Sequence, residues 1–194
     1  MMRKRRHRQH FVMALSASAT RGTLVSGWLR LPCALGRSGQ RAIKREGDGA
    51  TPVGRHRVER LMFRADRGPR PGGGLPTTAI AKNDGWCDAP EDRNYNRPVR
   101  HPYGTSAEHL WRTDALYDVV VILDHNQRPR VRGGGSAIFL HIARGDGHPT
   151  EGCVAVSRAG MRHLLGRLSA GDTLIVGTSR PGHKKSPERG RVPG

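Results

Sequence analysis

The chain has 194 residues and a formal net charge of +18, from 34 Lys and Arg against 16 Asp and Glu. This length fits one domain. Hydrophobic residues make up 35% of the chain, and 26 Gly and 13 Pro favour a turn-rich, strand-rich fold over a helix bundle. No apolar stretch approaches the ~18 residues that a membrane-spanning helix needs. The three Cys form an odd set, so at least one thiol stays unpaired within the chain, which does not fit a disulfide scaffold.

Positive charge concentrates at the two ends of the chain. Residues 1–10 hold five Lys and Arg and no acid, and residues 179–194 hold five with one Glu. Neither end has an apolar face to bury, so we expect disordered basic arms at 1–9 and 179–194 around a domain at 10–178. Such arms fit either attraction to a polyanion or an Arg-rich composition with solvated ends. No zinc-finger, helix-turn-helix or aromatic RNA-binding pattern accompanies the charge, so a nucleic-acid partner is not expected.

The first apolar segment allows two interpretations. Basic residues followed by Phe11–Leu15 and small side chains resemble a short secretory signal. The same segment also fits a first strand that pairs with residues 23–31 across a Ser-Ala-Thr-Arg-Gly turn. Ser16 and Ser18 interrupt the apolar stretch, which favours the strand, so this segment does not establish export.

Further along the chain, the patterns predict a mainly β domain with one or two helices. Alternating or β-branched runs indicate strands at four places: 55–63, 117–124, 137–142 and 173–176. Residues 64–76 form a Gly- and Pro-rich loop. Residues 82–114 show no clear period, and a long irregular segment of this kind is often functional. Ser157 is a suitable N-cap for a helix over 157–168, and Gly171 is a stop signal.

One histidine and one cysteine flank a loop of 11 residues and fit nucleophilic chemistry. His141 ends the strand at 137–142, and Cys153 follows the loop. A nearby base activates a thiol, and Gly152 lets a substrate approach, with the amides around it placed to hold an oxyanion. The alternative is a buried small thiol and a hydrogen-bonded strand-end imidazole, and the spacing alone leaves both open. The remaining histidines show no ligand spacing with Cys or carboxylates, so neither a metal nor a cofactor is expected.

Two separated motifs resemble one enzyme family. Residues 138–142 and 149–157 read Ile-Phe-Leu-His-Ile and Pro-Thr-Glu-Gly-Cys-Val-Ala-Val-Ser, and residues 44–54 contain a Gly-x-x-x-Thr-Pro-x-Gly stretch. The Gly-Gly-Gly-Ser turn at 133–136 precedes the His strand. With their flanking strands in the same order, these motifs resemble the L,D-transpeptidase catalytic domain, the YkuD-like family, in a compact and divergent branch.

The resemblance implies a β-sandwich with a short helix after the cysteine, and it implies roles for individual residues. Cys153 would attack a peptidoglycan stem peptide at a diaminopimelate-type residue, release D-alanine, and pass the acyl group from its thioester to an amine. His141 would be the general base, the backbone carbonyl of Ile142 would orient its imidazole, and amides near Gly152 would hold the oxyanion. Such an enzyme serves bacterial cell-wall biogenesis and cell shape, which implies a periplasmic or cell-envelope location; the sequence shows no convincing signal peptide, so a cytoplasmic location is the alternative.

Three departures from the family pattern leave the reaction partners open. Glu151 stands where the family usually has His, Ala155 stands where it usually has Arg, and the interval from His141 to Cys153 is short. With water as acceptor, the same groups would make a thiol peptidase or amidase. A basic polyanion-binding module with a degenerate site is a third possibility, and the sequence does not indicate an oligomeric state.

Segment 82–114 is expected to supply the groups that these departures remove. Its aromatic, amide and cationic side chains suit the carboxylates and amides of a stem peptide. The expected substrate-binding residues come from this segment and from the loop before the cysteine: Trp86, Tyr95, Asn96, Arg97, Thr150 and Glu151. The aromatic members fit equally well as plugs of a loop-covered core.

Overall fold

The structure, a computed structural model, describes residues 7–145 and 147–178. The fold is mainly β, as predicted, with one short helix in the described part. The expected basic arms fall mostly outside the described residues. The folded domain nevertheless begins before residue 10, because Gln9 starts strand β1 and the Arg8 amide donates to Asp172 at 2.8 Å. In the part of the chain that the structure covers, no helix is long and apolar enough to cross a membrane.

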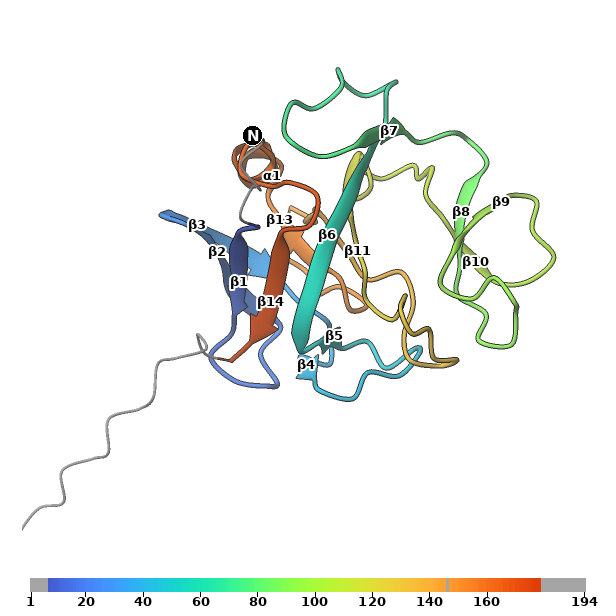
Figure 1. Cartoon of the computed structure of the whole chain (residues 1–194), viewed down its shortest axis with the longest axis horizontal. Helices are drawn as coiled ribbons and strands as arrows, with labels where there is room; N and C mark the ends of the chain where they lie inside the picture. Colours follow the sequence, from blue (N-terminus) through green and yellow to red (C-terminus); the bar gives the residue numbers. More distant parts are fainter. Residues whose placement is uncertain (1–6, 146, 179–194) are drawn as a thin grey trace, which may run out of the picture.

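One large sheet forms most of the domain (Figure 1). Its strands are β1 (Gln9–Met13), β2 (Arg21–Ser26), β3 (Leu29–Ala34), β6 (Gly54–Phe63), β7 (Thr77–Ala79), β11 (Val119–Leu123), β12 (Phe139–Ile142), β13 (Val154–Val156) and β14 (Thr173–Gly177). They are ordered β11-β12-β13-β3-β2-β1-β14-β6-β7, and β11 also pairs with β6. The ladder therefore folds back on itself and encloses a core of aliphatic side chains, including Leu24, Leu61, Val121 and Leu140.

The predicted first hairpin forms, with one change. Strands β1 and β2 pair antiparallel, with Phe11 opposite Val25. The segment expected as one strand at 23–31 is two strands, because Gly27 adopts φ +62° and turns the chain from β2 into β3. A positive φ is easy for glycine and costly for most other residues, and this explains the turn at that position.

Helix α1 (Arg158–Leu165) follows β13, as predicted. The Ser157 side chain caps it by accepting a hydrogen bond from the Gly160 amide at 3.0 Å. The helix ends at Leu165, three residues before the predicted end, and it buries Met161 and Leu165 against the core.

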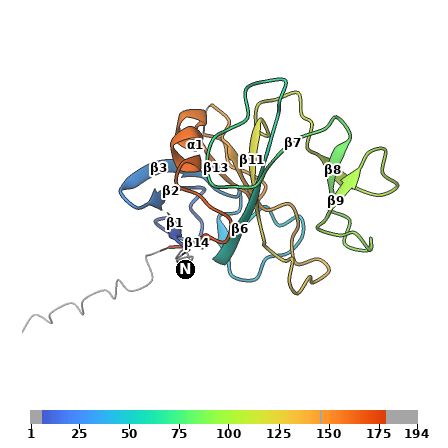
Figure 2. The ribbon, with the colours of Figure 1, turned by 45° about the horizontal axis from the view of Figure 1, so that its top comes forward.

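Segment 82–114 is not irregular, which corrects the expectation. It contains β8 (Asp84–Cys87), β9 (Pro98–Arg100) and β10 (Ala107–His109), which form a small separate sheet. The strands are too short and too polar to show a period in the sequence. Figures 1 and 2 both place this sheet at the end of the domain away from β1–β3. A third, two-stranded sheet joins β4 (Gln40–Arg41) to β5 (Thr51–Pro52).

Candidate active site

The loop that carries Cys153 is fixed by hydrogen bonds from two threonines. The Thr150 hydroxyl donates to the Cys153 carbonyl at 2.6 Å and accepts from the Gly152 amide at 3.1 Å. Thr51 donates to the same Cys153 carbonyl at 3.4 Å. Gly152 has φ +135°, and a Cβ built there would lie 2.8 Å from the Ala50 carbonyl oxygen. The Thr-Pro stretch therefore packs directly behind the cysteine, which gives the second sequence motif a structural role.

Cys153 and His141 face the same cavity. Strands β12 and β13 run parallel, with His141 opposite Ala155. Because side chains two positions apart along a strand point to the same face, Cys153 lies on the same face of the sheet as His141. Both side chains line a cavity of about 660 Å³. The strand register, which the sequence does not specify, thus brings together two residues that are twelve positions apart.

The imidazole of His141 is held by the backbone carbonyl of the next residue. Its Nδ1 lies 2.9 Å from the Ile142 carbonyl oxygen. A carbonyl only accepts, so Nδ1 carries the proton and Nε2 is left as the basic nitrogen. The Tyr117 ring packs edge-on against the imidazole, with the ring centroids 5.3 Å apart. Burial lowers the pKa of His141 to about 4, so the imidazole is neutral at neutral pH.

The thiol of Cys153 is also neutral at rest. Burial raises its pKa to about 12, and the negative charge of Glu108 adds to this effect. The Phe139 amide donates to Sγ at 3.3 Å and lowers the pKa, and the thiol itself donates to the Ala137 carbonyl at 3.2 Å. Thiol and imidazole are therefore both neutral, and attack on a substrate needs transfer of the thiol proton.

A carboxylate and a guanidinium from segment 82–114 complete the cavity wall. Glu108 accepts a hydrogen bond from the Tyr117 hydroxyl at 2.6 Å, and Arg112 lies 3.9 Å from the same carboxylate. Arg112 is fixed by Asp114 through two hydrogen bonds, at 2.9 and 2.7 Å. Burial is the main cause of the raised pKa of Glu108. The positive charge of Arg112 also lowers the pKa of His141, so it favours the neutral imidazole.

The structure separates the predicted substrate-binding residues into two groups. Thr150 and Glu151 line the cavity with Cys153. Glu151, in the position where the family usually has His, is exposed and pairs with Arg37 at 2.7 Å.

The other four predicted substrate-binding residues do not line this cavity, which corrects the expectation. Trp86 is buried, packs edge-on against Phe139 at 5.1 Å and donates to Asn96 at 2.9 Å. Asn96 is buried too and donates to two backbone carbonyls, so its amide is fully used in the fold. Tyr95 is buried and donates to Glu46 at 2.5 Å, and Arg97 is exposed outside the cavity. Trp86 and Tyr95 are therefore core residues, which was the alternative interpretation of these two aromatic side chains.

Segment 82–114 does reach the cavity, but through side chains other than the predicted ones. Asp88, Glu108 and Arg112 all line the cavity with the cysteine. Ala155, where the family usually has Arg, also lines it, so Arg112 supplies a cation to this cavity from another element. No sequence signal marks these three residues, because the small sheet that carries Glu108, and that Asp88 and Arg112 follow, is not visible in the pattern.

A thiol and an oriented neutral imidazole that share a cavity on a mainly β domain form the arrangement of a cysteine acyl-transfer site. The family model of the L,D-transpeptidase catalytic domain, YkuD, matches residues 12–176. The chain therefore belongs to the L,D-transpeptidase catalytic domain family, which acts on peptidoglycan peptides. Comparison with curated proteins and with solved structures finds no significant match.

Proposed function

We propose that this chain is a cysteine L,D-transpeptidase that forms a thioester between Cys153 and a peptidoglycan stem peptide. The observation that carries the proposal is the shared cavity of Cys153 and His141, with His141 Nδ1 held 2.9 Å from the Ile142 carbonyl. Family membership supports the reaction class, and the tautomer set by Ile142 leaves Nε2 as the proton acceptor.

In the proposed first half-reaction, Nε2 of His141 takes the thiol proton while Sγ attacks the donor carbonyl. A carbon–sulfur bond forms, and the carbonyl π electrons move to oxygen. The Cys153 amide is the expected donor to this oxyanion. The Gly152 amide, also expected there, already donates to Thr150 in the structure. When the tetrahedral intermediate collapses, the carbon–nitrogen bond to D-alanine breaks, and the imidazolium returns the proton to the leaving amine.

In the second half-reaction, an acceptor amine attacks the thioester, the carbon–sulfur bond breaks, and the thiolate regains a proton through His141. The net change is exchange of one amide bond for another, with no oxidant or reductant. The charged groups of the cavity suit zwitterionic peptides: Arg112 can pair with a substrate carboxylate, and Glu108 can pair with an ammonium. Because peptidoglycan lies outside the cytoplasmic membrane, we also propose a cell-envelope location.

The decisive experiment is incubation of the full chain with a disaccharide tetrapeptide, with and without an added amine acceptor, followed by mass analysis of products and intact protein. We expect loss of D-alanine, a cross-linked or amine-exchanged product, and a protein adduct at Cys153. Cys153→Ala and His141→Ala should abolish both products. Cys87→Ala is the matched control, since Cys87 is buried outside the cavity, and it should retain activity.

Two outcomes would contradict the proposal. Release of D-alanine that ends in hydrolysis even with excess amine would make the protein a thiol peptidase or amidase. An adduct confined to Cys33 or Cys87 would remove Cys153 as the nucleophile.

A further inference from the structure

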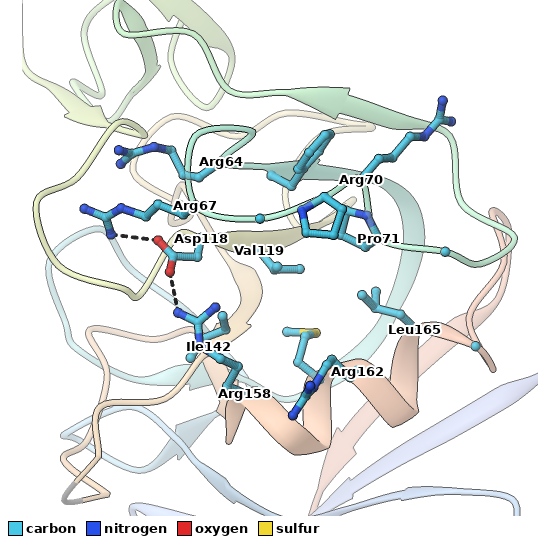
Figure 3. A pocket seen from close by; sticks show the side chains of 16 residues that line it. Arg64, Arg67, Arg70, Pro71, Asp118, Val119, Ile142, Arg158, Arg162 and Leu165 are labelled. Carbon is cyan, nitrogen blue, oxygen red and sulfur yellow. Dashed lines mark hydrogen bonds and ion pairs between the residues drawn. The ribbon is translucent and has the colours of Figure 1, made fainter.

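A second cavity lies behind the strands that carry the active site (Figure 3). It has a volume of about 590 Å³ and is enclosed by the loop after β6, the start of β11, the end of β12 and helix α1. Along β12, His141 lines the active-site cavity and Ile142 lines this one. Just before β11, Tyr117 lines the active-site cavity and Asp118 lines this one. Because neighbouring residues of a strand point to opposite faces, the two cavities are separate sites.

The floor of this second cavity is apolar. Val119, Ile142, Met161 and Leu165 come from two strands and the helix, and Pro71 closes the loop side. Figure 3 shows Val119 and Leu165 between the loop that carries Pro71 and the helix below it. A cavity of this size is within the range of small-molecule sites, which span roughly 300–1,000 Å³.

The rim of the cavity is cationic. Five arginines and one aspartate contribute to the lining: Arg64, Arg67, Arg70, Arg158, Arg162 and Asp118. Five positive charges against one give an excess of four over those residues, and Asp66, which pairs with Arg64 just outside the lining, reduces it to three.

Two of these arginines are committed to the fold. Arg64 forms two hydrogen bonds with Asp66, both at 2.8 Å, and stacks on Trp111 at 3.6 Å. Arg67 pairs with Asp118 at 2.7 Å and donates to backbone carbonyls, including that of Thr113 at 2.8 Å. Their guanidinium groups are fixed and have little left to offer a ligand.

The other three arginines have donors to spare. Arg158 shares Asp118 with Arg67 and is half-exposed. Arg162 lies one helical turn further along α1, on the same side of the helix. Arg70 comes from the facing loop, and neither Arg70 nor Arg162 has an acidic partner among residues 7–145 and 147–178. Arg70, Arg158 and Arg162 therefore place donors at the edges of an apolar floor, a combination that suits an anion with an apolar group.

We propose that this second cavity binds an alkyl phosphate, that is, a phosphate monoester on a hydrocarbon chain. The guanidinium fork matches phosphate oxygens in pairs, and a dianion offsets an excess of several positive charges better than a monoanionic carboxylate does. The hydrocarbon chain would cover Val119, Met161 and Leu165. This inference goes beyond the proposed function and does not depend on it.

The test is calorimetric titration of the full chain with hexyl phosphate at physiological salt. Inorganic phosphate, hexyl glucoside and hexanoate are the comparison ligands. We expect one hexyl phosphate per chain, bound at least about tenfold more tightly than any of the three. Arg162→Ala should weaken binding about tenfold, whereas Arg30→Ala, an equal charge change at an exposed arginine on β3, should leave it unchanged.

Further experiments show which cavity the ligand occupies and where the ligand comes from. Binding should survive Cys153→Ala and Arg112→Ala, and loss of affinity in either variant would put the ligand in the active-site cavity and overturn the proposal. Equal losses with Arg162→Ala and Arg30→Ala, or equal affinity for hexyl glucoside, would also overturn it. Sedimentation with phosphatidic acid vesicles separates a membrane source, which gives Arg162-dependent pelleting, from a soluble one, which gives none. Circular dichroism of each variant shows whether it is folded.

Discussion

The rate of Cys153 acylation should persist to unusually low pH. Burial lowers the pKa of His141 to about 4; the Ile142 carbonyl and Asp114 oppose this shift, and the charge of Arg112 adds to it. At about pH 5.5, a group with a pKa of about 4 is about 97% neutral, whereas an ordinary histidine with a pKa of about 6.5 is about 9% neutral. A base that must be neutral should therefore be about tenfold more available at that pH than an ordinary histidine.

The thiol does not obscure this measurement. Burial raises the pKa of Cys153 to about 12, so the thiolate is negligible across the acid range and the rate reports the imidazole. The assay is the rate of adduct formation by a carbapenem-type acylating agent, followed by the mass of the intact protein from about pH 4 to 8. His141→Ala should abolish the acid limb together with most of the rate. An acid midpoint between about 6 and 7, in protein that circular dichroism shows to be folded, would refute the reasoning.

Three further predictions concern the same cavity and the buried histidines. Gly152→Ala should destabilise the protein by about 1–3 kcal/mol and lower its thermal midpoint, because Gly152 has φ +135° and the new Cβ would meet the Ala50 carbonyl oxygen. Gly104→Ala is the control and should change stability little, because no atom lies within 4 Å of a Cβ built there. Glu108→Gln should lower the pKa of Cys153, because the carboxylate raises it, so the midpoint of alkaline alkylation by iodoacetamide should move down; an unchanged midpoint would contradict this. Burial lowers the folded-state pKa of four histidines: His10, His56, His125 and His141. Stability should therefore be complete above about pH 6.5 and fall below it, by up to about 1.4 kcal/mol per pH unit for each histidine, and a urea midpoint that rises on acidification would contradict this.

The sequence by itself determined the elements whose signals are local. The β-branched run that becomes β11, the alternation that becomes β6 and the cap at Ser157 are set by neighbours in the chain, so they were predictable. The motifs around Cys153 and His141 also selected these two residues through their resemblance to a family, which the spacing alone did not do.

The tertiary structure alone decided which side chains surround the thiol. The parallel register of β12 and β13 puts His141 and Cys153 on one face. A small sheet of short polar strands turns Glu108 into the cavity while burying Trp86, and the segment just after it brings in Arg112. The pKa values follow from burial and from charges that are distant in sequence, neither of which a one-dimensional pattern contains. The arginine-rimmed cavity has the same origin: its walls come from a loop, two strands and a helix that meet only when the sheet closes on itself.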